Sequence, residues 1–594
     1  MAYTFSPLTN ERSVRMLILA PGSNDDVLRG HLEVVAIDIL GSYEAISYVW
    51  GGSNERRTFV CEGLPLSLTT SLYLALTRLR LKDRTRRLWA DQICIDQENL
   101  EERGQQVQFM NRIYRSASHV LVWLGQDHNR AAATSFKLFR DLSEIHHNKE
   151  TQEKTDLEYL EHHEYQSEAV WAPLKVFTNL AWFTRAWIVQ EIGTQAPATL
   201  FWGTEEIDWE LVFGVCEALA SYHGLRKRFD IQTSKVRYVF QRFVEPEWTS
   251  RHANRFCFIY ELHRARHLQV SDPRDRVFAL LGHYSIRQRS GEGLRSLKAD
   301  YTRSVDDVYI DLAARALYED AKSLITLAAV QYSTLELAGE SALPSWVPDW
   351  RQYSSHILSE PTCSHRAHGG TIPRLTIDLA SRSLVIHGII IDSIAKHSAG
   401  IRPKSFYADG NVESTTVETL WRDVCGKNKF GFTDMYVNGE TALFAFLQTL
   451  SNGCATLKWN LNSDHHAAPA ETWLAYGAAY LSRLFAGTEK ITDEIQDRGS
   501  SGDASQWIRA ANSASTNRSL AVTDKGYYVL GPKVLRDGDM ICVLFGGKMP
   551  FCLRPREDGT YYLVGECYVH GFMEGQAIDD LQQGRRDEAK FTIV

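Results

Sequence analysis

The first 215 residues predict an α/β domain that is built on a parallel sheet with helices on both faces. Strand-like and helix-like segments alternate there, and the segments Arg87–Ile95 and His119–Leu124 are almost continuously apolar. Apolar runs of this kind are typical of parallel strands that helices cover on both sides. Beyond about Glu210 the pattern turns helical, and near the C-terminus it turns β-like. We therefore expect a helical region and then a C-terminal β-rich module after the α/β domain.

The elements of the α/β domain follow from turn signals and hydrophobic spacing. Pro21-Gly22 and Gly41-Ser42 separate three short β-like runs. Apolar residues then recur at intervals of three and four, which predicts an amphipathic helix. In order, we expect strands at Val14–Leu19, Leu32–Ile37 and Glu44–Trp50, a helix around Leu72–Leu79, the strand Arg87–Ile95, a helix around Val107–Tyr114, the strand His119–Leu124, a polar insertion at about 127–168 and a helix over Leu174–Ile192.

The rest of the chain divides into regions with different patterns. Residues 216–355 carry helical stripes, and residues 356–488 mix helical and β signals. Residues 489–518 are rich in Ser, Asp, Gly and Asn, which predicts a flexible loop. Residues 519–594 hold several short strands with glycine-rich turns. That pattern is typical of a small β-barrel or sandwich.

Composition narrows the functional classes. The 594 residues are 44% hydrophobic and 23% charged, which is the mix of a folded globular protein. The 65 Lys and Arg against 73 Asp and Glu give a net charge of −8, so there is no basic excess for a nucleic-acid surface. No apolar run reaches the roughly 18–20 residues of a membrane helix, and the N-terminus lacks a signal-peptide pattern. The ten Cys form no CxxC pair, so we expect reduced thiols and a cytoplasmic location.

Standard catalytic and cofactor motifs are absent from the sequence. It contains no GxGxxG, HExxH, GxSxG or kinase signature, and Gly546-Gly547-Lys548 lacks the spacing of a phosphate-binding loop. His465-His466 and Glu471 do not have the usual spacing of metal ligands. We therefore expect neither a metal nor a bound cofactor.

Three separated motifs carry a resemblance to a known family. They are AISYVWG at residues 45–51, LWADQICIDQ at 88–97 and RAWIVQE at 185–191. Their content and order resemble the fungal heterokaryon-incompatibility (HET) domain, whose pattern usually has Asn where this chain has Asp96. Further segments, SDPRDRVFALLG at 271–282, LPSWVPDW at 343–350 and GECYVHGFMEG at 565–575, resemble other parts of long HET proteins. The resemblance implies a protein of non-self recognition that triggers programmed cell death when genetically different fungal cells fuse.

The order of elements in the N-terminal domain is similar to that of the TIR fold, a flavodoxin-like α/β domain. Ala45–Tyr48 resembles its first strand, Ile113–Leu124 its helix–Ser–strand segment, and Trp182–Ile192 a segment in which Glu follows an aromatic residue. In enzymatic TIR domains that Glu is required to cleave NAD between nicotinamide and ribose. The resemblance therefore implies Glu191 as the catalytic residue of an NAD glycohydrolase, with NAD as its substrate.

The residue types in the motifs are compatible with this bond cleavage. Positive charge builds on the ribose as nicotinamide leaves, and a carboxylate such as Glu191 would stabilise it. Tryptophans such as Trp50 offer flat faces for nicotinamide or adenine. Arg185, and also Arg112 or Arg115, offers a guanidinium for the pyrophosphate.

The candidate binding residues gather at one predicted edge of the sheet. Tyr48–Gly51 and Asp91–Asp96 fall at the carboxyl ends of predicted parallel strands, where ligands bind. We therefore expect a site in which Glu191 is catalytic and in which the substrate contacts Ser47, Tyr48, Trp50, Gly51, Asp91, Asp96, Arg185 and Trp187.

Each of these assignments has a structural alternative. Glu191 can be a salt-bridged helix residue, and the Trp side chains can pack in the core. Asp91 and Asp96 can cap the following helix, or Asp91 can pair with Arg185. The domain would then be a non-catalytic module that forms a homo-oligomer on activation and signals through protein partners. A further hypothesis is that the C-terminal β module binds a ligand or partner and restrains the first domain.

Overall fold

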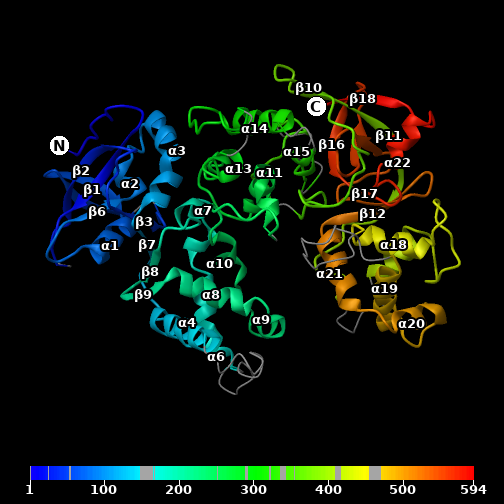
Figure 1. Ribbon diagram of the computed structural model, residues 1–594, viewed down its shortest axis with the longest axis horizontal. Helices are drawn as coiled ribbons and strands as arrows, with labels where there is room; N and C mark the ends of the chain where they lie inside the picture. Colours follow the sequence, from blue (N-terminus) through cyan, green and yellow to red (C-terminus); the bar gives the residue numbers. More distant parts are fainter. Residues whose placement is uncertain are drawn as a thin grey trace. The chain divides into compact units, whose positions relative to one another are not determined.

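Two units assemble from interleaved stretches of the chain in the computed structural model (Figure 1). The first unit comprises Met1–Glu245, His267–Arg289 and Ser296–Ser304, and the second comprises Pro246–Arg266, Ser290–Arg295 and Val305–Val594. The predicted helical region 216–355 is therefore not one body but is divided between the units. The described residues are 2–23, 26–52, 55–147, 165, 167–250, 252–287, 292–319, 323–332, 334, 343–352, 355–407, 416–453 and 470–594. Most of the second half of the predicted insertion lies outside them.

The first unit is built on a nine-stranded mixed sheet. In sheet order its strands are β5 (Leu64–Thr69), β4 (Arg56–Cys61), β2 (Arg29–Ala36), β1 (Ser13–Leu19), β6 (Arg86–Trp89), β3 (Glu44–Tyr48), β7 (His119–Gly125), β8 (Ala198–Trp202) and β9 (Glu205–Asp208). The centre, β6-β3-β7-β8, is parallel, as the alternating pattern predicts. The pairs β1–β2, β4–β5 and β8–β9 are antiparallel, so the prediction of a wholly parallel sheet is wrong. Connections shorter than about a dozen residues join these pairs, and a parallel crossover needs more.

Two long helices of this unit begin at the residues that their sequence signals indicate. The Thr69 hydroxyl accepts a hydrogen bond from the Leu72 amide and caps α1 (Thr70–Leu79), whose apolar stripe is buried. Asn99 caps α3 (Leu100–Ser116) in the same way. The other helices of the unit are α2 (Asp91–Cys94), α4 (Ala132–His147), α6 (Glu168–Thr178), η2 (Ala181–Thr184), α7 (Ile188–Glu191), α8 (Trp209–Leu219), α9 (His223–Phe229), α10 (Ser234–Val239), α12 (Asp275–Phe278) and α13 (Tyr284–Arg287).

The β4–β5 hairpin lies where the sequence pattern indicated no strand. Residues 56–58 of β4 are exposed and polar, so they hide the alternation that marks a strand. Glu62 and Gly63 have positive φ angles of 51° and 81°, which suit the two-residue turn of a hairpin. The Glu-Gly pair was thus the available signal for this hairpin.

Two predicted elements of the first unit are shorter than their apolar patterns suggest. The strand predicted over Arg87–Ile95 ends at Trp89, and α2 begins two residues later at Asp91. The helix predicted over Leu174–Ile192 is broken into α6, η2 and α7. Between η2 and α7 the Ala186 amide donates to the Gln269 carbonyl at 3.0 Å, so the backbone there bonds to a distant segment and not along a helix. Tertiary pairing therefore overrides the local periodicity.

The second unit contains a closed barrel of five strands, β14 (Met540–Leu544), β15 (Phe551–Pro555), β16 (Tyr561–Glu566), β18 (Glu588–Ile593) and β11 (Ser383–His397), with β11 pairing back to β14. The strands β10 (Leu375–Asp378), β12 (Arg518–Thr523), β13 (Tyr528–Pro532) and β17 (Tyr568–Val569) extend it. The short strands predicted in 519–594 are confirmed, but that boundary is wrong because β11 completes the barrel. Register shifts after Ile390 and Ile394 let this one long strand pair with β14, β18 and β12.

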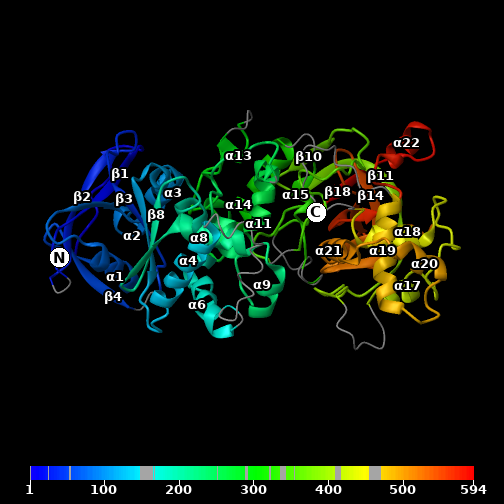
Figure 2. The same ribbon diagram turned by 60° about the horizontal axis from the view of Figure 1, so that its bottom comes forward.

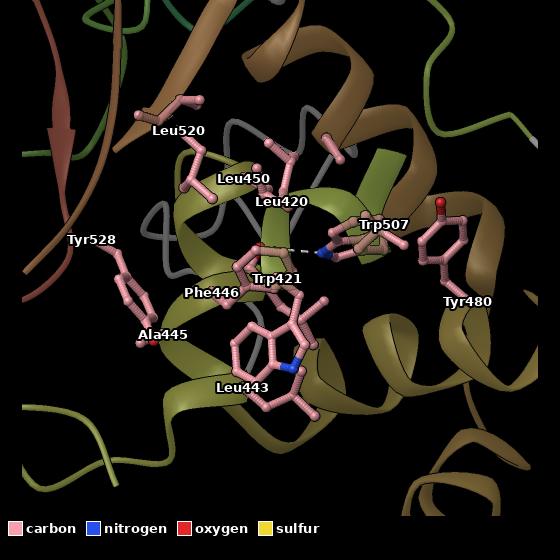
Figure 3. Packing of buried hydrophobic residues seen from close by; sticks show 14 of the residues in the cluster. Leu420, Trp421, Leu443, Ala445, Phe446, Leu450, Tyr480, Trp507, Leu520 and Tyr528 are labelled. Atoms are coloured by element: carbon pink, nitrogen blue, oxygen red, sulfur yellow. Dashed lines mark hydrogen bonds between the residues drawn. The ribbon is translucent and has the colours of Figure 1, made fainter. Parts of the chain in front are cut away.

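The segment 489–518, predicted as a flexible loop, forms α20 (Asp493–Gly499) and α21 (Ala504–Ser515) and then enters β12, so this prediction is wrong. Both helices pack against α19 (Ala470–Phe485), as both ribbon views show (Figures 1 and 2). A Cβ atom on Gly502 would lie 2.0 Å from the Ala475 carbonyl oxygen, so the glycine allows the backbones to approach. Trp507 stacks on Tyr480 with ring centroids 4.6 Å apart in a buried apolar cluster (Figure 3). The glycine at 502 therefore allows this segment to pack closely against α19.

The remaining helices of the second unit are η3 (Ala253–Phe256), α11 (Phe258–Ala265), α14 (Val305–Glu319), α15 (Ile325–Ala328), α17 (Thr416–Asp423), α18 (Ala442–Leu450) and α22 (Gln576–Gln582). The segment 343–350 forms neither helix nor strand, and its Trp346 and Trp350 are buried. Among the described helices, none has the length and apolar character needed to cross a membrane.

A buried ion pair ties the first strand of the first unit to α3. The Arg15 guanidinium contacts the Glu102 carboxylate at 2.5 and 3.0 Å, and the two side chains are 2% and 8% exposed. The same carboxylate accepts a hydrogen bond from the Asp96 amide at 2.8 Å. Glu102 therefore joins β1, α3 and the connection that leads into α3.

We expect Glu102→Ala to lower the free energy of unfolding by about 3–5 kcal/mol, because it leaves the Arg15 guanidinium buried without a counter-ion. Urea denaturation of the full chain measures the change. Glu101→Ala removes an exposed carboxylate one residue away and should change the same quantity by less than about 0.5 kcal/mol. Equal effects of the two variants would contradict this interpretation.

Candidate functional site

The three sequence motifs meet in one buried network in the first unit. Ser47 lies in β3, and Glu191 is the last residue of α7. The Ser47 hydroxyl donates a hydrogen bond to the Glu191 carboxylate and accepts one from the Trp182 indole at 2.8 Å. The Arg185 guanidinium binds both carboxylate oxygens of Glu191, at 3.0 and 3.1 Å. The exposed fraction of the Glu191 side chain is 2%, and that of Arg185 is 16%.

A second carboxylate, that of Asp91, lies beside this pair at the start of α2. Its two oxygens accept hydrogen bonds from the Trp50 indole and from the Gln92 amide, each at 2.8 Å. The buried Tyr48 hydroxyl faces the Asp91 carboxylate without completing a well-formed hydrogen bond. Asp91 and Trp50 are partly exposed, unlike Glu191. The first two motifs therefore form the more open side of the network.

The electrostatics of the network follow from two carboxylates that share one guanidinium. Burial raises the pKa of Glu191, and the attraction of Arg185 offsets only part of that rise. Burial likewise raises the pKa of Asp91 against the effect of the same guanidinium. Burial alone would lower the pKa of Arg185, but the Glu191 and Asp91 carboxylates outweigh it and the net shift is upward. The guanidinium is therefore the charge on which the rest of the network depends.

This arrangement brings together most of the predicted site residues. Ser47, Tyr48, Trp50, Asp91, Arg185 and Glu191 are joined by the contacts described above. The carboxylate oxygens of Glu191 are occupied by hydroxyl and guanidinium donors, so this acid is an interior ion-pair partner in this conformation. Of the two structural alternatives, a salt-bridged Glu191 describes these contacts, whereas the ion-pair partner of Arg185 is Glu191 and not Asp91.

Three other predicted residues are placed differently. The Trp187 indole donates to Asp275 at 3.2 Å, so it belongs to a neighbouring polar cluster. Asp96 accepts from the Glu98 amide at 3.2 Å in the turn before α3, and in the described parts of the chain no contact joins it to the network. Gly51 has a φ of +75°, a conformation that favours glycine after the strand β3.

Two residues that support the site, Trp182 and Asp275, were not among the predicted site residues. Trp182 donates to Ser47 from η2, and its position in the segment Trp182–Ile192 was the available signal. Asp275 accepts hydrogen bonds from Tyr301 at 2.6 Å and from Trp187, and Arg103 lies over the Tyr301 ring at 3.5 Å. Asp275 comes from the segment SDPRDRVFALLG, which the resemblance singled out without a role. That segment therefore holds the third motif in place through Trp187.

We expect Glu191→Leu to lower the free energy of unfolding by about 3–5 kcal/mol, because it leaves the Arg185 guanidinium uncompensated. The double variant Arg185→Met plus Glu191→Leu removes both charges and should recover at least half of that loss. Urea denaturation of the wild type and the variants measures both changes. An unchanged stability in the single variant would contradict the structural importance of the pair.

Asp275 should make the stability of the first unit depend on pH. Burial raises its pKa to about 6, whereas the unfolded chain has a value near 3.9. Between these values the native state binds more protons than the unfolded state, so native stability falls as the pH rises through about 4 to 6. Relative to Asp275→Asn, the wild type should lose up to about 3 kcal/mol across that window.

Denaturation curves at a series of pH values measure this loss. Asp300→Asn is the matched control, since hydrogen bonds from Thr302 lower the pKa of Asp300. The stability of the wild type relative to this control should not fall as the pH rises. A flat difference between the wild type and Asp275→Asn would refute the prediction.

Two family models match the chain, one in its N-terminal part and one in its C-terminal part. Residues 43–191 match "Heterokaryon incompatibility protein (HET)", and residues 448–589 match "Het-6 beta-barrel domain". The chain is 26% identical to "Heterokaryon incompatibility protein 6, OR allele" of Neurospora crassa over 676 aligned positions, which cover 96% of this chain and 95% of the relative. No solved structure matches the chain significantly.

The first family match begins just before β3 and ends at Glu191, so it contains all three motifs and every residue of the Ser47–Arg185–Glu191 network. The second contains α19 to α22 and most barrel strands. The resemblance of the motifs to the HET domain is thereby confirmed.

Proposed function

We propose that this chain acts in heterokaryon incompatibility, as an effector that responds to non-self and triggers programmed cell death. The observation that carries the proposal is the similarity to an incompatibility protein along nearly the whole of both chains. The two matched domains, HET first and Het-6 barrel second, add to it. The incompatibility partner would be a protein that differs between genetically distinct cells.

The geometry of the motif network favours a signalling module over an enzyme. A carboxylate that stabilises a cationic sugar must contact it directly. The Glu191 side chain is 2% exposed, and Ser47 and Arg185 occupy its oxygens. On this proposal the network holds β3, α2 and α7 in a fixed arrangement, and the domain signals through its outer surface to protein partners or to further copies of itself.

NAD hydrolysis by a TIR-like site is a second candidate. It is supported by the raised pKa of both Asp91 and Glu191, since perturbed acids concentrate at catalytic sites. The partly exposed Trp50 beside Asp91 offers a face for a nicotinamide or adenine ring. This candidate requires Arg185 to leave Glu191 when the protein is activated. The TIR-like fold, the cell-death outcome and the cytoplasmic location remain parts of the proposal.

One experiment separates the two candidates. The experiment expresses three full-length proteins from an inducible promoter in Neurospora crassa: the wild type, Glu191→Gln, and the double variant Arg185→Met plus Glu191→Leu. Cell death and the cellular NAD concentration are then measured in the same cultures. The signalling proposal expects death without prior loss of NAD, retained in the double variant if it keeps its fold. NAD loss that precedes death and disappears in the folded double variant would instead establish the hydrolase. If expression of the wild-type protein causes neither cell death nor incompatibility, both candidate functions are overturned.

A further inference from the structure

A cavity of about 470 Å³ opens on the first unit beyond the end of α7, at a place that none of the motif residues occupies. Its lining includes Asn111 and Arg115 of α3, Tyr284 and Arg287 of α13, and Phe243 and Glu245 from the segment after α10. Cavities of about 300–1,000 Å³ are the size that small-molecule ligands fill. The volume is therefore compatible with an organic ligand of nucleotide size.

Two guanidinium groups, those of Arg115 and Arg287, line this cavity. Burial lowers the pKa of Arg287, and the neighbouring Arg115 guanidinium lowers it further, so the two cations are close enough to repel. Neither makes an ion pair with an acidic residue in the described parts of the chain. The Glu245 carboxylate also lines the cavity, which leaves a net charge of about +1 from these three side chains. An anion between the guanidiniums would relieve the repulsion.

Asn111 adds a buried donor to the cavity wall. Asn111 is 3% exposed, and its amide oxygen accepts a hydrogen bond from Arg287 at 3.1 Å. Among the residues that the structure describes, its amide nitrogen has no hydrogen-bond partner. A buried donor without an acceptor costs about 1–3 kcal/mol, which a ligand oxygen would recover. Gly282 leaves room for Asn111, because a Cβ atom at residue 282 would lie 2.5 Å from the Asn111 Cβ.

Two aromatic residues, Phe243 and Tyr284, also line the cavity, together with Val244 and the polar Thr194 and Gln195. Phe243 and Tyr284 are 5% and 3% exposed, and their rings pack against the buried His283 with centroids 5.1 and 4.0 Å away. Contact with the same imidazole restrains both rings. The cavity thus combines cations and an amide donor with rigid rings, which is the combination that a phosphorylated ring compound requires.

We propose that this cavity binds a small organic phosphate of nucleotide size, with the phosphate between Arg115 and Arg287 and the ring system against Phe243. The Asn111 amide nitrogen donates to a phosphate oxygen. The site is distinct from the Ser47–Arg185–Glu191 network, and its occupation does not depend on whether that network is catalytic. Residues 193–195 connect α7 to this cavity, so a ligand there contacts the chain directly after the third motif.

Isothermal titration calorimetry of the full-length protein with AMP, inorganic phosphate and adenosine tests the proposal. AMP should bind at least about tenfold more tightly than either fragment, because it satisfies the guanidiniums and the rings together. Arg115→Gln and Arg287→Gln should each weaken AMP binding about tenfold or more, since each removes a charge-assisted hydrogen bond. Asn111→Leu should weaken it by a smaller factor.

Arg112→Gln is the matched control. It removes the same charge from the same helix, but at a residue that pairs with Asp38 and does not line the cavity. AMP binding should change less than about twofold in this variant. Thermal unfolding of each variant shows whether it keeps its fold, and Asn111→Leu provides a charge-neutral second test if an arginine variant does not.

Three results would overturn the proposal. The first is that AMP does not bind at millimolar concentration. The second is that Arg112→Gln weakens AMP binding as much as Arg287→Gln does. The third is that adenosine or phosphate binds as tightly as AMP. Because these are equilibrium measurements on the resting protein, they are independent of NAD turnover and cell death. If AMP does not bind, the proposed incompatibility function is therefore unaffected. If the incompatibility function is disproved, the proposed phosphate site is likewise unaffected.

Discussion

The buried guanidinium of Arg185, which pairs with Glu191 and is also attracted by Asp91, constrains how the three motifs come together. Burial of such charges is costly unless each group is paired and hydrogen-bonded, so Ser47, Trp182 and Asp91 must lie where they do around Arg185 and Glu191. These residues come from β3, α2 and the segment from η2 to α7. The three HET motifs thus correspond to one charge-compensation network, which explains why their residue types occur together in this chain.

The order of the chain does not follow the order of the units. The segment that begins at His267 returns to the first unit after Pro246–Arg266 has entered the second. It supplies Gln269, which pairs with the backbone beside Arg185, and Asp275, which binds the Trp187 indole. The third motif is therefore supported from both sides by a segment about 80 residues further along the chain. This support accounts for the resemblance of that segment to long HET proteins.

Local patterns predicted most elements where one face of the element is buried. The stripe of α1 and the apolar runs of β1 and β7 are buried as their spacing indicates. The pattern failed where small or polar residues have a packing role. Gly502 lets the connection between α20 and α21 approach the α19 backbone closely, and the segment that predicted a loop is largely helical. It failed again at Ala186, where a long-range backbone bond interrupts an apolar stripe.

The sequence by itself determined many of the element types, the α/β character of the first unit, the β-rich end of the second and three motifs whose residues meet at one place. Tertiary structure decided that Glu191 is interior and held by Arg185, that Trp187 contacts Asp275, and that Asp96 lies in a turn apart from the network. The physical reason is that hydrophobic periodicity is a local property of the chain, which neighbouring residues define. Desolvation and ion pairing depend instead on which distant groups the folded chain brings within a few ångströms, and one sequence alone does not reveal that.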